Sequence, residues 1–145
     1  MQPATPTPQR PYSVSVAGVV VDGAGRVLVI RRRDNGRWEP PGGILEPAET
    51  VEDGLVREIL EETGIRVGVE RLTGVYQHVP ARIIALVFRC HPLEGSAGAT
   101  AEATEARWVD RSSVDALMSP AFAVRIHDAF AGPAPVRAHD GERLY

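Results

Sequence analysis

The segment from residue 50 to residue 64 most constrains the fold, because it carries the start and stop signals of one amphipathic helix. Thr50 followed by Asp53 is the pattern of a capping box, and Gly64 is a typical residue just beyond a helix end. These signals predict a helix over residues 51–63, about 20 Å long at the usual rise per residue. Its apolar side must pack against other elements; that side consists of Val51, Leu55, Val56, Ile59 and Leu60.

Three glutamates share another side of this helix. Glu58, Glu61 and Glu62 lie three and four residues apart, and such steps return to the same helix face. Like charges at this spacing repel, and a bound divalent cation would relieve the repulsion. Carboxylates without histidine or cysteine favour Mg²⁺ or Mn²⁺ over Zn²⁺. From charge alone, an acidic solvated helix face is the plainer alternative.

The distribution of charge excludes several functional classes. Residues 39–62 hold eight acidic residues and one arginine, whereas the whole chain has a net charge of -3. This balance does not suit a protein that binds duplex nucleic acid. The chain has no lysine, which excludes a Walker A site and Schiff-base chemistry.

Other composition features concern cellular location. Cys90 is the only cysteine, so an internal disulfide and a thiolate metal cluster are excluded. No apolar run approaches the length of a membrane span, so we expect no membrane partner. We therefore expect a cytoplasmic protein.

The chain is expected to form one domain over residues 11–131, between an N-terminal tail (1–10) and a C-terminal tail (132–145). Residues 12–21 and 26–32 predict a β-hairpin around the turn at 22–25. Residues 38–43, with the sequence WEPPGG, predict a stiff loop. Further strands are predicted at 67–77, 82–90 and 105–109, the middle one central in its sheet, and further helices at 113–118 and 120–130.

The run GILEPAETVEDGLVREILEETGI at residues 43–65 resembles the Nudix box of the Nudix hydrolase (MutT-like) family. The invariant positions of that motif are filled by Gly43, Glu49, Arg57, Glu58, Glu61, Glu62 and Gly64. The resemblance implies an α/β Nudix fold, an α/β/α sandwich with a mixed central β-sheet. It also implies hydrolysis of the pyrophosphate bond of a nucleoside diphosphate linked to X, such as a (d)NTP or an ADP-ribose-like nucleotide sugar.

The same resemblance assigns roles within the box. Glu58, Glu61 and Glu62 would bind Mg²⁺ or Mn²⁺, with Glu61 or Glu62 also serving as the catalytic base. Gly42 or Gly43 would add a carbonyl ligand. Catalysis would also depend on Arg57 and Glu49, which would hold the carboxylates in position.

Residues outside the box are open to two interpretations. Glu102 and Glu105 are alternative bases or solvated loop carboxylates. Substrate contacts are predicted for Arg32 and Arg37 with phosphates, and for Trp38 and Tyr76 with a base. The arginines are equally explained as surface residues, and the aromatic residues as core.

Two functions fit this sequence. The complete set of box glutamates favours an enzyme acting on a small nucleotide, and the alternative is a catalytically silent Nudix module that senses nucleotides. The identity of X and the oligomeric state stay open, a homodimer included.

Overall fold

Two β-sheets occupy the middle of the structure, a computed structural model that describes residues 10–145. The larger sheet has the strand order β4-β1-β6-β5-β8 and the smaller one β3-β2-β7. In chain order the strands are β1 (Ser13–Val20), β2 (Val27–Arg32), β3 (Trp38–Glu39), β4 (Gly42–Ile44), β5 (Arg66–His78), β6 (Ile83–Glu94), β7 (Ala103–Val109) and β8 (Val136–His139). The larger sheet is mixed, because β1 runs parallel to β6 and β5 parallel to β8, while its other pairs are antiparallel.

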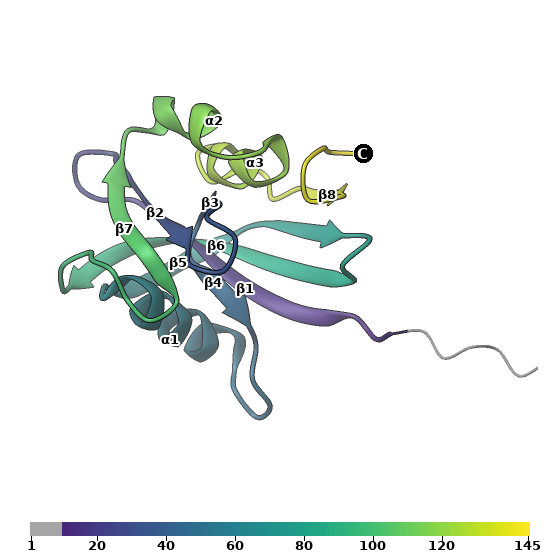
Figure 1. Cartoon of the computed structure of the whole chain (residues 1–145), viewed down its shortest axis with the longest axis horizontal. Coiled ribbons are helices and arrows are strands. Elements are labelled where there is room, and N and C mark those ends of the chain that lie inside the picture. Colours follow the sequence, from purple (N-terminus) through teal and green to yellow (C-terminus); the bar gives the residue numbers. More distant parts are fainter. Residues whose placement is uncertain (1–9) are drawn as a thin grey trace, which may run out of the picture.

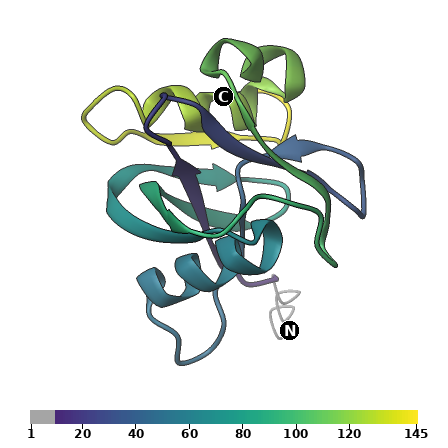
Figure 2. The same cartoon turned by 90° about the vertical axis from the view of Figure 1, so that its left-hand side faces the viewer.

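Helices cover both sides of the strands. Helix α1 (Val51–Thr63) lies on one side, and α2 (Val114–Leu117) and α3 (Pro120–Asp128) lie on the other, as Figures 1 and 2 show. A short 3₁₀ turn (Arg111–Ser113) precedes α2. This is the predicted α/β/α arrangement with a mixed sheet, although β2, β3 and β7 form a separate small sheet. Within residues 10–145, no helix has both the length and the apolar character needed to cross a membrane.

Strand β1 is buried on both faces and divides the core in two. Val16 and Val20 pack with Leu55 and Ile59 of α1 in one cluster. Ala17 and Val19 of the strand, with Val21 just beyond its end, join the second cluster beneath α2 and α3 (packed with Val114, Met118 and Ile126). Because successive side chains of a strand point to opposite faces, one apolar strand serves both helix layers.

The predicted hairpin is wrong. Residues 13–20 and 27–32 lie in different sheets and share only an isolated bridge between Val21 and Val27. Strand β1 instead pairs with β4 and β6, and β2 with β3 and β7. The turn itself is present, since the Asp22 carboxylate accepts hydrogen bonds from the backbone of Ala24 and Arg26. The pairing of β1 with β6 and of β2 with β7 joins segments far apart in the chain, so the local apolar pattern does not determine it.

Two further segments differ from the prediction. Residues 38–43, predicted to be a loop, contain β3 and the first two residues of β4. The predicted C-terminal tail is folded, because β8 pairs with β5 from Val136 to His139 and the side chain of His139 is fully buried. Of the predicted N-terminal tail, residues 1–9 lie outside the described part. Arg10 donates a hydrogen bond to the carbonyl of Ala81 at 2.8 Å.

The remaining elements agree with the prediction to within a few residues. Helix α1 has the predicted bounds, and β6 is the central strand of the larger sheet. Strand β6 runs four residues beyond its predicted end, to Glu94. Strand β5 and helices α2 and α3 form where the sequence places them.

Candidate active site

The helix caps fix the position of α1 in the site. The Oγ1 atom of Thr50 accepts a hydrogen bond from the Asp53 backbone N–H at 3.1 Å. At the other end Gly64 adopts a φ of 81°, the left-handed conformation that favours glycine. With both ends fixed and Leu55 and Ile59 fully buried, the glutamates of the last two turns have defined positions.

Two of these glutamates border an open cavity of about 1120 Å³. Glu58 and Glu62 of α1 line it, together with Gly42 and Gly43 of β4 and with Glu102 from the loop before β7. Glu58 and Glu62 are only 8% and 5% exposed. The predicted acidic face is therefore not simply a solvated helix surface.

Strand β4 lies directly against the carboxylate of Glu58. It pairs with β1 at the edge of the larger sheet, where Gly43 lies opposite Val16. A Cβ atom added to Gly43 would lie 2.4 Å from Oε2 of Glu58, far inside van der Waals contact. Glycine is thus required for the carboxylate to approach the strand this closely.

Glu62 makes a different contact with the same strand. Its Oε1 accepts a hydrogen bond from the backbone N–H of Gly42 at 2.8 Å. Burial, and to a smaller extent the negative charges of Glu39, Glu58 and Glu102, raise the pKa of Glu62 to about 8, despite the opposing effect of this hydrogen bond. Burial likewise raises the pKa of Glu58.

Three carboxylates converge beside the cavity. Oxygen atoms of Glu58, Glu61 and Glu102 all lie within 4.8 Å of one another. Such an all-oxygen set from one buried and two exposed residues suits Mg²⁺ or Mn²⁺, which bind a few carboxylates and leave positions for water and phosphate. The donor set therefore fits the predicted metal. Glu62 stands outside this group, and its role as a ligand stays a prediction, as does the carbonyl ligand from Gly42 or Gly43.

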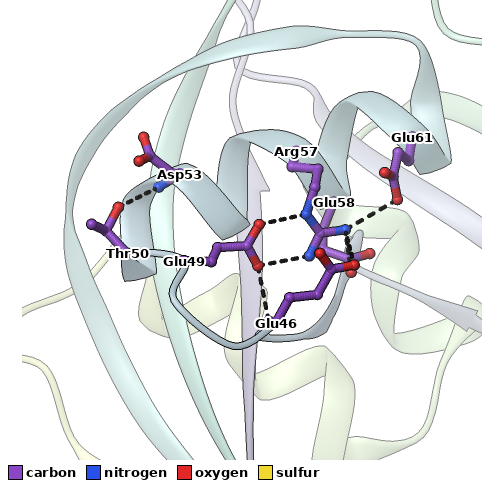
Figure 3. Close-up of polar contacts among 7 residues, drawn as sticks. All are labelled: Glu46, Glu49, Thr50, Asp53, Arg57, Glu58 and Glu61. Carbon is purple, nitrogen blue, oxygen red and sulfur yellow. Dashed lines mark hydrogen bonds and ion pairs between the residues drawn. The ribbon is translucent and has the colours of Figure 1, made fainter.

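Arg57 connects the carboxylates to one another (Figure 3). It donates two hydrogen bonds to Glu49, at 2.6 and 2.8 Å, and its Nη1 donates to Glu58 at 3.0 Å and to Glu61 at 3.2 Å. Glu46 adds a longer ion pair at 3.5 Å. The side chain of Arg57 thus lies between the loop before α1 and the two glutamates of the helix.

The structure separates the two alternative bases. Glu102 joins the carboxylate group, whereas Glu105 forms ion pairs with Arg31 and Arg107, at 3.7 and 3.6 Å, and does not line the cavity. Arg33, which the sequence did not single out for this role, holds the loop of Glu102. It donates hydrogen bonds to the carbonyls of Thr100 and Ala101 at 2.8 and 3.2 Å.

Three of the four predicted substrate contacts lie at the cavity. Arg32, Arg37 and Trp38 line the cavity, and Arg32 makes ion pairs with Asp34 and Glu39 at 2.5 and 3.4 Å. Arg37 pairs with Glu142, and Trp38 lies beneath Arg107.

The prediction for Tyr76 is wrong. Its side chain is fully buried and donates a hydrogen bond from its hydroxyl to Asp128 at 2.7 Å. It packs in the core beneath α3, so its ring has no free face for a base.

A partly buried carboxylate was missed. Glu39 of β3 lines the cavity, and burial raises its pKa, with Arg32 and Arg125 opposing the shift. Its charge in turn contributes to the raised pKa of Glu62. The acidic run 39–62 includes it, but nothing in the sequence distinguished Glu39 from the solvated acids of that run.

Comparison with known proteins decides the family. The family model described as NUDIX domain matches residues 11–130. The chain belongs to the NUDIX family.

Relatives of the Nudix protein agree with this assignment. A "MutT-like protein" of Streptomyces ambofaciens is 51% identical over 144 residues, 99% of this chain and 94% of the relative. An "ADP-ribose pyrophosphatase" of Methanocaldococcus jannaschii is 36% identical over 113 residues, which cover 72% of this chain and 66% of that protein. The crystal structure of a NUDIX hydrolase from Nitrosomonas europaea superimposes with a TM-score of 0.76 at 21% identity, over 90% of this chain and 81% of that one. The predicted family, fold and enzyme class, a Nudix pyrophosphohydrolase, are confirmed.

Proposed function

We propose that this Nudix protein is a Mg²⁺-dependent hydrolase that cleaves the pyrophosphate bond of a nucleoside diphosphate linked to X, such as a (d)NTP or an ADP-ribose-like nucleotide. Mn²⁺ would serve in place of Mg²⁺. The observation that carries the proposal is the convergence of Glu58, Glu61 and Glu102 within 4.8 Å beside a cavity large enough for a nucleotide. The activity named for the relative from M. jannaschii supports the nucleotide class.

The chemistry assigns separate roles to these residues. Glu58, Glu61 and Glu102 would hold the metal, with Glu62 beside them in the cavity wall. Bound Mg²⁺ would neutralise phosphate charge and lower the pKa of a coordinated water. Arg57 and Glu49 act through the ligands, because they fix the carboxylates of Glu58 and Glu61 in place.

The position of the catalytic base follows from accessibility. A base must reach a water molecule next to the bound phosphate. Glu61 and Glu102 are exposed, whereas Glu62 is buried and already accepts a hydrogen bond from Gly42. Glu61 and Glu102 are therefore better placed than Glu62 to remove the proton, since each would offer the metal one carboxylate oxygen and keep the other for the water.

Two arginines that line the cavity are suited to binding the anionic substrate. Arg32, the last residue of β2, and Arg37, on the loop that joins β2 to β3, line the cavity that Glu58, Glu62 and Glu102 also line. A guanidinium group recognises phosphate through paired N–H groups. The proposed substrate thus has both the acidic helix and these two arginines within the same cavity.

A panel of nucleotides tests the proposal. Purified protein is incubated with Mg²⁺ and with each (d)NTP or with ADP-ribose, and the phosphorylated products are quantified. We expect turnover of at least one nucleotide that falls by about tenfold or more in Glu61→Gln, whose exposed side chain makes a folding defect a poor explanation. Glu105→Gln serves as the matched control. Product formation no higher than that of Glu61→Gln with every nucleotide would overturn the proposed function.

A further inference from the structure

The loop that carries Glu102 packs against the C-terminal end of α1. The last four carbonyl groups of a helix have no partner within the helix. Here the carbonyl of Thr63 accepts a hydrogen bond from the backbone N–H of Gly98 at 3.2 Å. The carbonyl of Glu62 accepts one from Oγ1 of Thr100, also at 3.2 Å. The loop therefore supplies hydrogen-bond donors to the end of the helix that bears the glutamates.

The hydroxyl group of Thr100 joins this helix end to the backbone around Glu102. It donates to the carbonyl of Glu62 and accepts from the backbone N–H groups of Glu102 and Ala103, at 3.3 and 3.2 Å. A hydroxyl group has one proton to donate and two lone pairs that accept, so these three contacts use its full capacity. One side chain thus links two segments that carry acidic residues of the site.

The other side of the loop is held separately, by the residue just beyond β2. The backbone N–H of Arg33 donates to the carbonyl of Glu102 at 3.1 Å, and its guanidinium group donates to two further carbonyls of the loop. These bonds attach the loop to the smaller sheet. On the side of α1, the contact nearest to Glu102 along the chain is the hydroxyl group of Thr100.

Electrostatic repulsion acts against the approach of Glu102 to α1. Oxygen atoms of Glu58, Glu61 and Glu102 lie within 4.8 Å of one another. Like charges this close repel, and Glu102 stands on an exposed loop, where an outward movement would relieve the repulsion. The hydroxyl group of Thr100 opposes such a movement, because its hydrogen bonds to the two segments would have to break. The carboxylate of Glu102 is thereby kept close to the helix.

We propose that Thr100 is a positioning residue, whose hydroxyl group ties the Glu102 loop to the end of α1 and so brings the third carboxylate to the metal site. The inference rests on the proposed function, because it takes Glu58, Glu61 and Glu102 as ligands of a divalent cation. Thr100 acts on the backbone of Glu102 and not on the ion itself. Groups that orient metal ligands through hydrogen bonds affect metal affinity by about 10- to 100-fold when they are removed.

Metal binding without any nucleotide tests this role. Mn²⁺ is titrated into the protein, and the free ion is quantified by electron paramagnetic resonance. We expect Thr100→Val to weaken Mn²⁺ binding by about tenfold, because valine has the shape of threonine but no hydroxyl group. Thr100→Ser keeps the hydroxyl group and should bind Mn²⁺ as the wild-type protein does. Thr104→Val is the matched control, since the hydroxyl group of Thr104 contacts the carbonyl of Arg31 and does not line the cavity.

A double variant separates positioning from a general structural effect. If Thr100 acts through Glu102, the double variant of Thr100→Val with Glu102→Gln should bind Mn²⁺ no more weakly than Glu102→Gln alone. A structural effect independent of Glu102 would make the two losses add. If Thr100→Val does not fold, Thr100→Ala, which also lacks the hydroxyl group, takes its place with the same expected results.

Three results would each overturn the inference. They are a wild-type Mn²⁺ affinity in Thr100→Val, a loss in Thr100→Ser as large as that in Thr100→Val, and additive losses in the double variant. The absence of Mn²⁺ binding by the wild-type protein would overturn it as well. Any of these results together with nucleotide hydrolysis would overturn the inference alone. Mn²⁺ binding that depends on Thr100, without hydrolysis of any nucleotide, would overturn only the proposed function.

Discussion

Arg57 binds Glu49 through two nearly parallel hydrogen bonds, from Nε to Oε2 at 2.6 Å and from Nη2 to Oε1 at 2.8 Å. These hydrogen bonds, with a smaller contribution from the backbone N–H of Glu46, lower the pKa of Glu49 to about 2. The third nitrogen, Nη1, stays available for Glu58 and Glu61. Glu49 holds Arg57 in place, and the planar guanidinium group of Arg57 therefore orients two carboxylates of the proposed metal site.

Replacing Arg57 tests this positioning role. We expect Arg57→Ala to lower kcat by about 10- to 100-fold with a smaller change in KM, because the arginine acts on the ligands and not on bound substrate. Arg57→Lys should lose most of the same activity, since an ammonium group cannot bind Glu49 through two parallel bonds. Steady-state kinetics with Arg111→Ala as control measures both. An effect on KM alone would refute the role.

The pair Glu102 and Glu105 offers a matched comparison within one loop and strand. Glu102→Gln should lower kcat by about tenfold or more and reduce the rise in Tm that Mg²⁺ produces, since a metal bound only by the native state stabilises it. Glu105→Gln should leave both unchanged, because Glu105 pairs with surface arginines. Equal effects of the two variants on kcat would contradict the metal site described above.

A methyl group at Gly43 should damage the site without unfolding the protein. The nearest neighbours of the added carbon atom are carboxylate atoms of Glu58. They are the end of a flexible side chain, which moves more easily than backbone. We expect Gly43→Ala to displace this carboxylate and lower kcat by about tenfold or more, with a Tm close to that of wild type. Gly98→Ala is the control, because its added Cβ would have no neighbour within 4 Å. Wild-type kcat in Gly43→Ala would show that the close approach is not needed.

Asp128 should make stability depend on pH. Burial alone would raise its pKa, but hydrogen bonds from Arg137, at 2.8 and 2.9 Å, and from Tyr76 leave it lowered. A lowered pKa means that the contribution to stability is present at neutral pH and is lost as the pH falls below about 4.

We therefore expect Asp128→Asn to lower the free energy of unfolding by about 2 kcal/mol at pH 7. The loss should shrink as the pH falls below about 4, where the wild-type carboxylate also takes up a proton. Denaturant titrations across pH measure it, with the exposed Asp115→Asn as control. A loss of the same size at pH 3 and pH 7 would contradict this account.

The sequence predicted elements that rest on local signals. Helix α1 could be placed to the residue because Thr50 and Gly64 mark its ends. The central position of β6, though not its end, could be predicted because its apolar run needs burial on both faces. The partners of β1 could not be predicted, since pairing with β6 depends on a strand far along the chain. The strand β8 was missed because it is four residues long and Val136 is 79% exposed, which leaves no apolar pattern.

In the site, too, residues set by a local pattern could be predicted, and residues placed by long-range contacts could not. The box glutamates were identified from their spacing, which is local to one helix. Glu102 could be named only as one of two alternatives, because the loop that carries it is held by Arg33 through backbone carbonyls. Thr100 gave no signal, since its hydroxyl group bonds to Glu62, which lies far away in the sequence.

The parallel pairing of β1 with β6 sets the order in which the catalytic centre is completed during synthesis. Ser13 pairs with Ile83, so β1 lacks that neighbour until more than half of the chain has left the ribosome. Strand β4, which presents Gly43 to Glu58, pairs with β1, and Glu102 follows β6 in the chain. Local contacts form α1 early, but long-range pairing is slow. A nascent chain therefore carries the acidic helix well before the residues of the proposed metal site can come together.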